Sequence, residues 1–282
     1  MQTMKDTTSP YPRSSWRLIT SPPATGVWNM AVDSAILQAV IQGQSPPTLR
    51  LYSWSPPCLS LGYNQPISDV DLERLQAKGW DLVRRPTGGR AILHTDELTY
   101  AVIGPKSDPR LDGGVLTSYQ RLAQALAAAL LSLDLPVRTL TEKGEDFDPR
   151  QPICFEFPSD FEITAGGKKI IGSAQARKQT GVLQHGSLPL WGDLSRITRV
   201  LHFQSTAERT AAAAALLNRA ATVETVLGRE ISWESAAAAF QRAFSDVLNL
   251  DLQEAPLSQD ELDRARELMH SRYDHRKWTF RI

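Results

Sequence analysis

Short apolar runs bounded by turn residues alternate along this chain with longer stretches of helical period. Val32, Ile36 and Val40 repeat every four residues, which is the spacing of one helix face. This pattern predicts a helix that Asn29 caps and that ends near Ile41. Further helices are predicted at Asp71–Lys78, Ser118–Ser132 and Ser258–Met269. The predicted strands are Trp16–Ile19, Thr48–Tyr52, Cys58–Leu61, Asp81–Arg84, Ala91–His94, Leu98–Ile103, a hairpin of Asp160–Thr164 with Lys168–Ala174, and Val182–Leu190.

These elements predict an α+β fold. Residues 1–15 have no apolar segment and are expected to form a disordered leader. Residues 16–192 are expected to form the catalytic α+β domain, and residues 193–282 a helical C-terminal portion packed on it. Residues 141–152 are charged and proline-containing, so we expect an exposed loop there.

The charge balance narrows the class of protein. The 282 residues include 31 Lys and Arg and 31 Asp and Glu, whereas a nucleic-acid-binding protein usually shows a strong basic excess. The chain has no run of about 18 apolar residues and no signal-like leader, so no membrane partner is expected. We therefore expect a cytoplasmic protein with reduced thiols at Cys58 and Cys154. Spacings such as CxxC or HExxH do not occur, so no metal site is predicted.

Two adjacent glycines follow a predicted strand within Arg84–His94. Adjacent glycines let the backbone approach a ligand closely and point N–H groups at it. Three arginines flank Gly88 and Gly89, which suits an anionic group such as phosphate. The same stretch also fits an ordinary hairpin turn with solvated arginines, and a lone glycine pair does not decide between the two.

Cys154 lies beside a proline-rich loop and shares its region with basic residues that include Lys169. A thiolate is a strong nucleophile, and a nearby ammonium lowers the thiol pKa from its reference of about 8.5. A lysine can also stabilise the negative charge that develops on an acyl carbonyl. A lone cysteine is more often a small buried hydrophobe, an interpretation that we apply to Cys58. His94 and His185 lie near these stretches, where a histidine is more often a structural hydrogen-bonding residue than a catalytic base.

Spacing alone does not establish a Cys–Lys pair. The predicted hairpin turns at Gly166, which places Lys169 opposite about Ile163. Cys154 is then too far along the strand, by about five to ten residues at about 3.3 Å each. Because Pro158 interrupts a strand ladder, the cysteine can reach the lysine if its segment folds back there.

Together these stretches resemble the lipoyl/octanoyl-protein transferase and ligase superfamily. The resemblance is closest to the octanoyltransferase branch that works through a cysteine and whose acceptor is the glycine-cleavage H protein. It covers about residues 16–280 and implies a curved mixed sheet flanked by helices, similar to the biotin-ligase catalytic domain. The matching segments are Trp16-Arg17, Trp28–Asp33, Leu51–Trp54, Ser60–Gln65, Arg84–His94, Glu97–Tyr100, Cys154–Ile163, Gly172–Gln175, Leu183–Ser187 and Tyr273–Trp278.

The resemblance assigns roles to particular residues. It implies that Cys154 is the nucleophile and that Lys169 is the lysine of the G-x-K-x-x-G-S-A pattern, with Lys168 less favoured. Gly88 and Gly89 are implied to cradle the acyl group. The residues implied for substrate binding are Arg84, Arg85, Gly88, Gly89, His94, Gly172, Ser173, Ala174 and His185.

The implied reaction moves an octanoyl group from the phosphopantetheine of an acyl carrier protein to Cys154, and then to a lysine of H protein or another lipoyl domain. Thioester exchange needs no ATP, so no cofactor is expected. ATP-dependent lipoate ligases typically have a third glycine where this chain has Arg90, and they lack the cysteine. Three alternatives stay open: such a ligase, an amidotransferase between lipoyl domains, and a non-catalytic lipoyl-domain-binding protein. We expect a monomer.

Basic residues gather around both stretches. A cluster of this kind can steer the acidic surfaces of carrier and acceptor proteins. The alternative is a solvated surface without a specific partner. The cluster comprises Arg84, Arg85, Arg90, Lys168, Lys169, Arg177 and Lys178.

Overall fold

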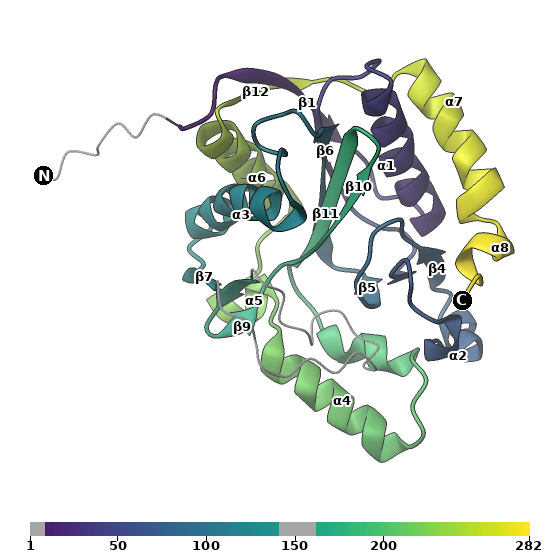
Figure 1. The fold of residues 1–282 in the computed structure, drawn as a ribbon. Helices are drawn as coiled ribbons and strands as arrows, with labels where there is room; N and C mark the ends of the chain where they lie inside the picture. The colour runs from purple at the N-terminus through teal and green to yellow at the C-terminus, as the bar shows by residue number, and fades with distance from the viewer. Residues whose placement is uncertain (1–8, 141–161) are drawn as a thin grey trace, which may run out of the picture.

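A computed structural model describes residues 9–140 and 162–282, and Figure 1 shows how they are arranged. Cys154 and the predicted loop 141–152 lie outside the described residues. The fold is mixed α+β, as the sequence predicts, with helices on both faces of a large sheet. No helix in the described part of the chain is long and apolar enough to cross a membrane.

The largest sheet among the described residues has six strands, in the order β10-β11-β6-β2-β1-β12. β1 pairs parallel with both β2 and β12, whereas β6 pairs antiparallel with β2 and β11. Because β6 is buried along nearly its whole length, its sequence is an almost continuous apolar run. The strands are β1 (Ser14–Thr20), β2 (Thr48–Tyr52), β6 (Glu97–Pro105), β10 (Gly172–Lys178), β11 (Gly181–Pro189) and β12 (Leu250–Glu254).

The other strands of the described residues form two three-stranded sheets. Between β8 and β9, Gly166 and Gly167 have φ angles of +59° and +77°, a left-handed conformation that favours glycine. The predicted Gly-Gly hairpin is therefore confirmed, with a shorter second strand. The two sheets are formed by β4 (Asp81–Arg84), β3 (Cys58–Leu61) and β5 (Ile92–His94), and by β7 (Val137–Leu140), β8 (Glu162–Ala165) and β9 (Lys168–Lys169).

Helices α3 and α6 cover one face of the six-stranded sheet, and α1 covers the other, with α7 packed against α1 (Figure 1). Alternation along β6 explains this layering, because Tyr100 belongs to the core under α3 and α6 and Ala101 to the core under α1. A third apolar cluster joins α4 to β3 through Leu59 and Leu216. The helices are α1 (Gly26–Ile41), α2 (Leu72–Ala77), α3 (Val115–Ser132), α4 (Thr206–Arg219), α5 (Val223–Leu227), α6 (Trp233–Leu248), α7 (Gln259–Leu268) and α8 (Arg276–Thr279), with short turns η1 (Ile67–Asp69), η3 (Leu194–Arg199) and η4 (Met269–Tyr273).

The first helix begins earlier than the sequence pattern predicts. Thr25, not Asn29, is its N-cap, and the Thr25 hydroxyl accepts a hydrogen bond from the backbone N–H of Trp28. Asn29 is buried inside α1, where its amide donates to the carbonyl oxygens of Ala24 and Ser53. The cap prediction was wrong because a polar residue at a helix start is usually a cap, whereas this one is held by tertiary contacts.

The C-terminal portion contributes a strand that the sequence pattern did not predict. β12 pairs with β1 in a parallel register that starts at Ser14 and Leu250, and Ser14 itself lies within the predicted leader. The last helix, by contrast, is confirmed. The Ser258 hydroxyl accepts from the backbone N–H of Glu261, and the Glu261 carboxylate accepts from the backbone N–H of Ser258.

Arg17→Ala is expected to destabilise the fold strongly. The Arg17 guanidinium is 6% exposed and donates to both carboxylate oxygens of Glu261 at 2.7 and 2.6 Å, which joins β1 to α7. Removing one partner leaves the other charge buried, at a cost of about 3–5 kcal/mol. Urea unfolding should show this loss. The matched substitution Arg13→Ala removes an exposed pair with Asp251 and should cost less than about 1 kcal/mol, so equal effects would contradict this account.

Candidate functional site

The loop after β4, residues 85–90, is held tightly against the end of β3; we call it the glycine loop. Gly89 has a φ of +90°, in the left-handed region that favours glycine. A Cβ placed on Gly62 would lie 1.8 Å from the carbonyl oxygen of Gly89, so the two backbones approach too closely for any larger residue. The backbone N–H of Tyr63 also donates to the carbonyl oxygen of Thr87 at 2.8 Å. Close backbone packing therefore fixes the loop.

Two arginines at the start of this loop, one just before it and one its first residue, bind backbone carbonyl oxygens. Arg84 is fully buried and donates to the carbonyl oxygen of Thr279 and to three carbonyl oxygens that follow β3. Arg85 donates to the carbonyl oxygens of Gly88 and Arg90 at 2.8 and 2.7 Å. The Arg84 guanidinium therefore fixes the loop and the C-terminal segment.

A pocket with about 370 Å³ of empty space, open solvent included, lies between β3, β5, β10 and β11. Much of its remaining wall is aromatic or apolar, from Met30, Tyr52, Trp54 and Ile92. Arg84, Gly88 and Gly89 are not among its lining residues. Six of the nine residues predicted to bind substrate do line it, and they are Arg85, His94, Gly172, Ser173, Ala174 and His185.

His185 links the glycine loop to α1 at the wall of this pocket. Its Nε2 lies 2.7 Å from Thr87 Oγ1, and its Nδ1 lies 3.3 Å from a carboxylate oxygen of Asp33. Burial lowers the pKa of His185, although Asp33 opposes this. Burial raises the pKa of Asp33, but Arg50 and His185 together bring it below its ordinary value. The histidine thus acts as a structural hydrogen-bonding residue in a charged network.

Glu97 organises another wall of the pocket and was not identified from the sequence. His94 Nδ1 lies 2.7 Å from Glu97, and the hydroxyls of Thr99 and Ser187 each donate to it at 2.5 Å. The Trp54 ring stacks on His94 at 3.9 Å and donates its N–H to Thr99. Burial raises the pKa of Glu97, but His94 and the two hydroxyls hold it below its ordinary value. The sequence did contain a signal for this residue: a carboxylate stands at the start of an apolar strand. A charge buried there requires hydrogen-bonding or charged partners, so a polar network could have been expected around it.

Glu97→Gln is expected to reduce the acid sensitivity of the fold. The pKa of Glu97 in the folded protein lies below its ordinary value of 4.5, so the unfolded chain takes up the proton first as the pH falls. The stability that Glu97 contributes is therefore fully present above about pH 4.5 and is lost as the pH falls through the folded pKa. Urea unfolding between pH 6 and pH 3 should show a shallower pH dependence for the variant. Identical slopes would mean that Glu97 titrates alike in both states.

Lys169 lies in β9 and is 7% exposed. It pairs with Thr164, one residue from the predicted partner Ile163, and its carbonyl oxygen accepts from the backbone N–H of Ala221 after α4. Lys168 points the other way and donates its Nζ to a carbonyl oxygen of α4 at 2.5 Å. The two lysines therefore differ as neighbours on a strand should.

Of the two cysteines, only Cys58 lies within the residues that the structure describes. Cys58 is fully buried under α1, and a Cβ on Gly26 would lie 2.3 Å from its sulfur. Burial raises the pKa of the Cys58 thiol well above its ordinary value, with smaller effects from Asp81 and Glu97. Cys58 is thus a buried hydrophobe, as predicted. Cys154 lies outside the described residues.

The predicted steering cluster is only partly a surface feature. Arg84, Arg85 and Lys169 are buried and therefore cannot act as exposed charges. Arg177 donates to the Ser118 hydroxyl and to a backbone carbonyl, whereas Lys178 is half-buried at the end of β10. A solvated or partner-binding role fits only the four partly exposed members of the cluster, which are Arg90, Lys168, Arg177 and Lys178.

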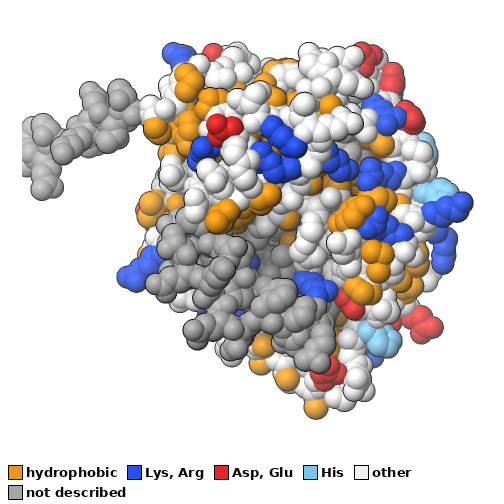
Figure 2. Space-filling model, viewed as in Figure 1, with side chains coloured by type: hydrophobic (Ala, Val, Ile, Leu, Met, Phe, Trp, Pro, Cys, Tyr) orange, Lys and Arg blue, Asp and Glu red, His pale blue; other side chains and the backbone are white. Residues whose placement is uncertain are grey.

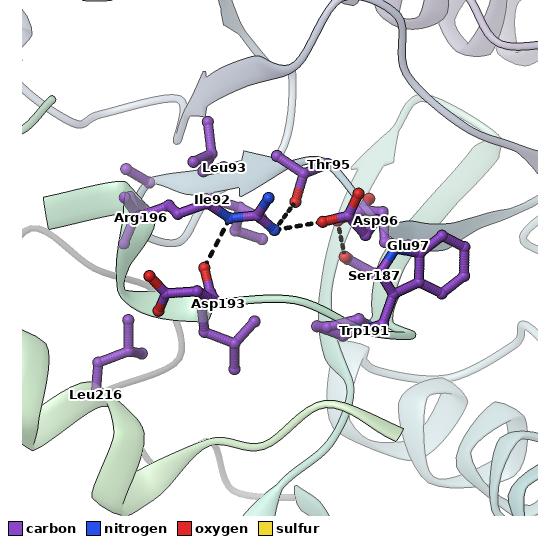
Figure 3. A pocket seen from close by; sticks show the side chains of 14 residues that line it. Ile92, Leu93, Thr95, Asp96, Glu97, Ser187, Trp191, Asp193, Arg196 and Leu216 are labelled. Atoms are coloured by element: carbon purple, nitrogen blue, oxygen red, sulfur yellow. Dashed lines mark hydrogen bonds and ion pairs between the residues drawn. The ribbon is translucent and has the colours of Figure 1, made fainter. Parts of the chain in front are cut away.

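A second pocket, with about 480 Å³ of empty space including open solvent, adjoins the first and shares Ile92 and Ser187 with it (Figure 3). Arg196 points into it, with its guanidinium 2.5 Å from Asp96 and 2.9 Å from the Thr95 hydroxyl. In the part of the chain that the structure describes, no three His, Cys, Asp or Glu side chains are grouped to hold a metal ion.

Comparison with known sequences identifies related enzymes. The family model described as the lipoyl protein ligase A/B catalytic domain matches residues 25–245. A curated octanoyltransferase LipM of Moorella thermoacetica is 41% identical over 96% of this chain and 99% of its own length. The octanoyltransferase LipM of Bacillus subtilis is 33% identical over 95% of this chain and 99% of its own length.

Comparison with solved structures points to the same fold. A bipartite lipoate protein ligase from Thermoplasma acidophilum, solved in a study of an archaeal lipoylation system with its E2 lipoyl domain, superposes with a TM-score of 0.78. It is 28% identical, and the match covers 95% of this chain and 97% of that one. A lipoate-protein ligase A bound with ATP gives a TM-score of 0.77 at 27% identity and covers 95% of this chain and 99% of that one.

Proposed function

The chain belongs to the lipoyl protein ligase A/B family, and from this we propose that it transfers octanoyl to a lipoyl-domain lysine through a thioester on Cys154. Octanoyl transfer is the activity of curated relatives that match nearly the whole chain, and it is the activity of this chain. The thioester, the donor and the acceptor are the proposed parts. The donor is an acyl carrier protein, and the acceptor is the glycine-cleavage H protein or another lipoyl domain.

The placement of Lys169 is the observation that carries this proposal. The lysine is buried in β9, and three residues later the chain reaches Gly172, which lines the pocket. An apolar pocket can hold an acyl tail, and the ammonium of a lysine so close to it in the sequence suits the carbonyl oxygen that becomes negative during acyl transfer. The fully buried Cys58 cannot serve as the nucleophile, which leaves Cys154.

The reaction balances as two acyl transfers. In the first, the Cys154 sulfur attacks the donor thioester carbonyl, the donor C–S bond breaks, and the thiol proton ends on the departing pantetheine sulfur. In the second, the acceptor amine nitrogen attacks the Cys154 thioester, the C–S bond breaks, and one amine proton returns to the Cys154 sulfur. In this proposal Lys169 stabilises the negative oxygen in both steps. Because the first step only exchanges one thioester for another, no ATP is consumed.

The partners follow from this chemistry. A carrier-bound acyl group is already a thioester, so it is a suitable donor. A lipoyl domain as acceptor is supported by the Thermoplasma acidophilum neighbour, which was studied together with its E2 lipoyl domain.

Intact-mass measurement of the purified protein with octanoyl-carrier protein tests the proposal. Without nucleotide or acceptor, the protein should gain one octanoyl mass on the peptide that contains Cys154, and neutral hydroxylamine should release it. Adding H protein should discharge the adduct into a stable amide. If free acid is used only with ATP and magnesium and no Cys154 adduct forms, the chain is a ligase. If acylated lipoyl domains load Cys154 and octanoyl-carrier protein does not, it is an amidotransferase.

Acyl chain length is expected to affect the first step in a graded manner. Each buried methylene contributes about 0.8 kcal/mol, or about fourfold in rate, until the pocket ends. The stacked rings of Trp54 and His94 form part of its wall. Single-turnover acylation with donors of four to sixteen carbons should rise to about eight carbons and then fall. A flat profile would contradict a closed pocket.

A further inference from the structure

We propose that a cationic surface formed by Lys178 and the C-terminal segment docks the acidic carrier protein that delivers the acyl group. This inference rests on the proposed function, because it concerns the donor of that reaction. The surface, which we call the C-terminal cationic surface, comprises Lys178, Arg272, Arg276, Lys277 and Arg281.

Aromatic rings hold three of these cations in place. The Arg272 guanidinium lies 3.7 Å from the centre of the Trp278 ring, and the Arg281 guanidinium lies 3.7 Å from the centre of the Tyr63 ring. Tyr63 and Trp278 contact each other edge-on at 5.7 Å, so the two stacks are continuous. Guanidinium groups stacked in this way are pre-positioned with their N–H edges available to carboxylate or phosphate.

The surface has a surplus of positive charge. Within the described residues, none of its five side chains forms an ion pair with a carboxylate, whereas nearby Arg264 and Arg266 pair with Glu267 and Asp263. Asp274 is the one acidic residue in segment 268–282. Figure 2 shows Lys and Arg side chains gathered on this face, from the tip of the β10–β11 hairpin toward the C-terminal helices. A cationic surface of this kind favours an anionic partner.

The surface is hydrogen-bonded to the residue before the glycine loop and to Tyr63, which packs against that loop. The Trp278 ring N–H donates to the carbonyl oxygen of Arg84 at 2.8 Å, and Arg281 donates to the carbonyl oxygen of Tyr63 at 3.0 Å. Lys178 ends β10, the strand whose first residues line the pocket, about 20 Å away at about 3.3 Å per residue. A protein docked here would therefore need to present its acyl group on a long arm.

The chemistry of the two partners favours the donor over the acceptor. A phosphopantetheine arm is long and carries a phosphodiester, so the donor brings an anion with its acyl group. The reacting group of the acceptor is a lysine, whose ammonium the surface repels. The carrier protein is thus the occupant that the charges select.

A paired charge reversal tests the proposal. Arg276 and Lys277 are both exposed on α8, so Arg276→Glu with Lys277→Glu is not expected to disturb the core. Acylation of Cys154 is measured with octanoyl-carrier protein and with octanoyl-pantetheine, a small thioester without phosphate or protein. The variant should lose about tenfold or more in kcat/KM with the carrier donor, and the loss should shrink at high salt. With octanoyl-pantetheine it should match the wild type.

Arg242→Glu is the matched control, because Arg242 is an exposed cation on α6, which covers the opposite face of the sheet. Equal rates for the paired variant, the control and the wild type with octanoyl-carrier protein would overturn the docking surface. A loss confined to discharge onto the lipoyl domain would overturn it as well and assign the surface to the acceptor. If the wild type forms no Cys154 adduct with either donor, the proposed function fails instead.

Discussion

Cys154→Ala is expected to abolish octanoyl transfer while the protein keeps its fold. In the proposed reaction the acyl group is bonded to the Cys154 sulfur between the two steps, so alanine leaves it no atom to bond to. The other thiol cannot replace it, because the Cys58 sulfur is fully buried under α1 and its raised pKa keeps it protonated. Incubation with octanoyl-carrier protein should give no octanoyl mass gain on the variant. Subsequent addition of H protein should give no amide.

Cys58→Ala is the matched control for this substitution. It should keep most of the activity and lose about 1–2 kcal/mol of unfolding free energy, because it removes a buried sulfur from the α1 core. Circular dichroism and urea unfolding of both variants separate loss of chemistry from loss of fold. Near-full turnover by Cys154→Ala would show that the covalent mechanism is wrong.

The sequence predicted most elements of the fold because they are local. The four-residue spacing of apolar positions in α1, the Gly-Gly hairpin and the capping box of α7 each arise within a few residues. The strand β12 was missed because its position depends on β1, whose register partner Ser14 lies 236 residues before Leu250. Pairing between strands so far apart in the sequence depends on the tertiary fold, so no local sequence pattern predicts it.

The site was predicted unevenly for a similar physical reason. Motif positions such as Gly172 and His185 line the pocket, since they lie on paired strands that bring them together. The contacts of Glu97 with Ser187 join residues 90 positions apart, so the buried network could not be recognised from spacing. Arg84 was assigned to an anion because an arginine beside glycines suggests a phosphate site, and its complete burial is visible only in three dimensions.

Lys169 differs from its neighbour in a way that makes a kinetic comparison informative. Its side chain is 7% exposed and belongs to the side of β9 that packs inward, whereas the Lys168 amine lies on the outer side against α4. If the lysine stabilises the negative oxygen of the reacting carbonyl, it acts in both acyl transfers. Its loss should then slow acylation of Cys154 and also discharge onto the lipoyl domain.

Lys169→Ala is expected to lower the rate of both steps by about 100-fold or more, which is the usual cost of removing one charge-stabilising or proton-transferring group. Rapid-quench measurement of octanoyl-enzyme formation and of its discharge gives the two rates separately. Lys168→Ala, which removes the same charge from the other side of β9, should cost much less. Urea unfolding of both variants shows whether the loss of a buried side chain has weakened the fold. If Lys168→Ala proves inactive and Lys169→Ala does not, the roles of the two lysines are reversed, and the charge-stabilising group lies on the α4 side of the strand.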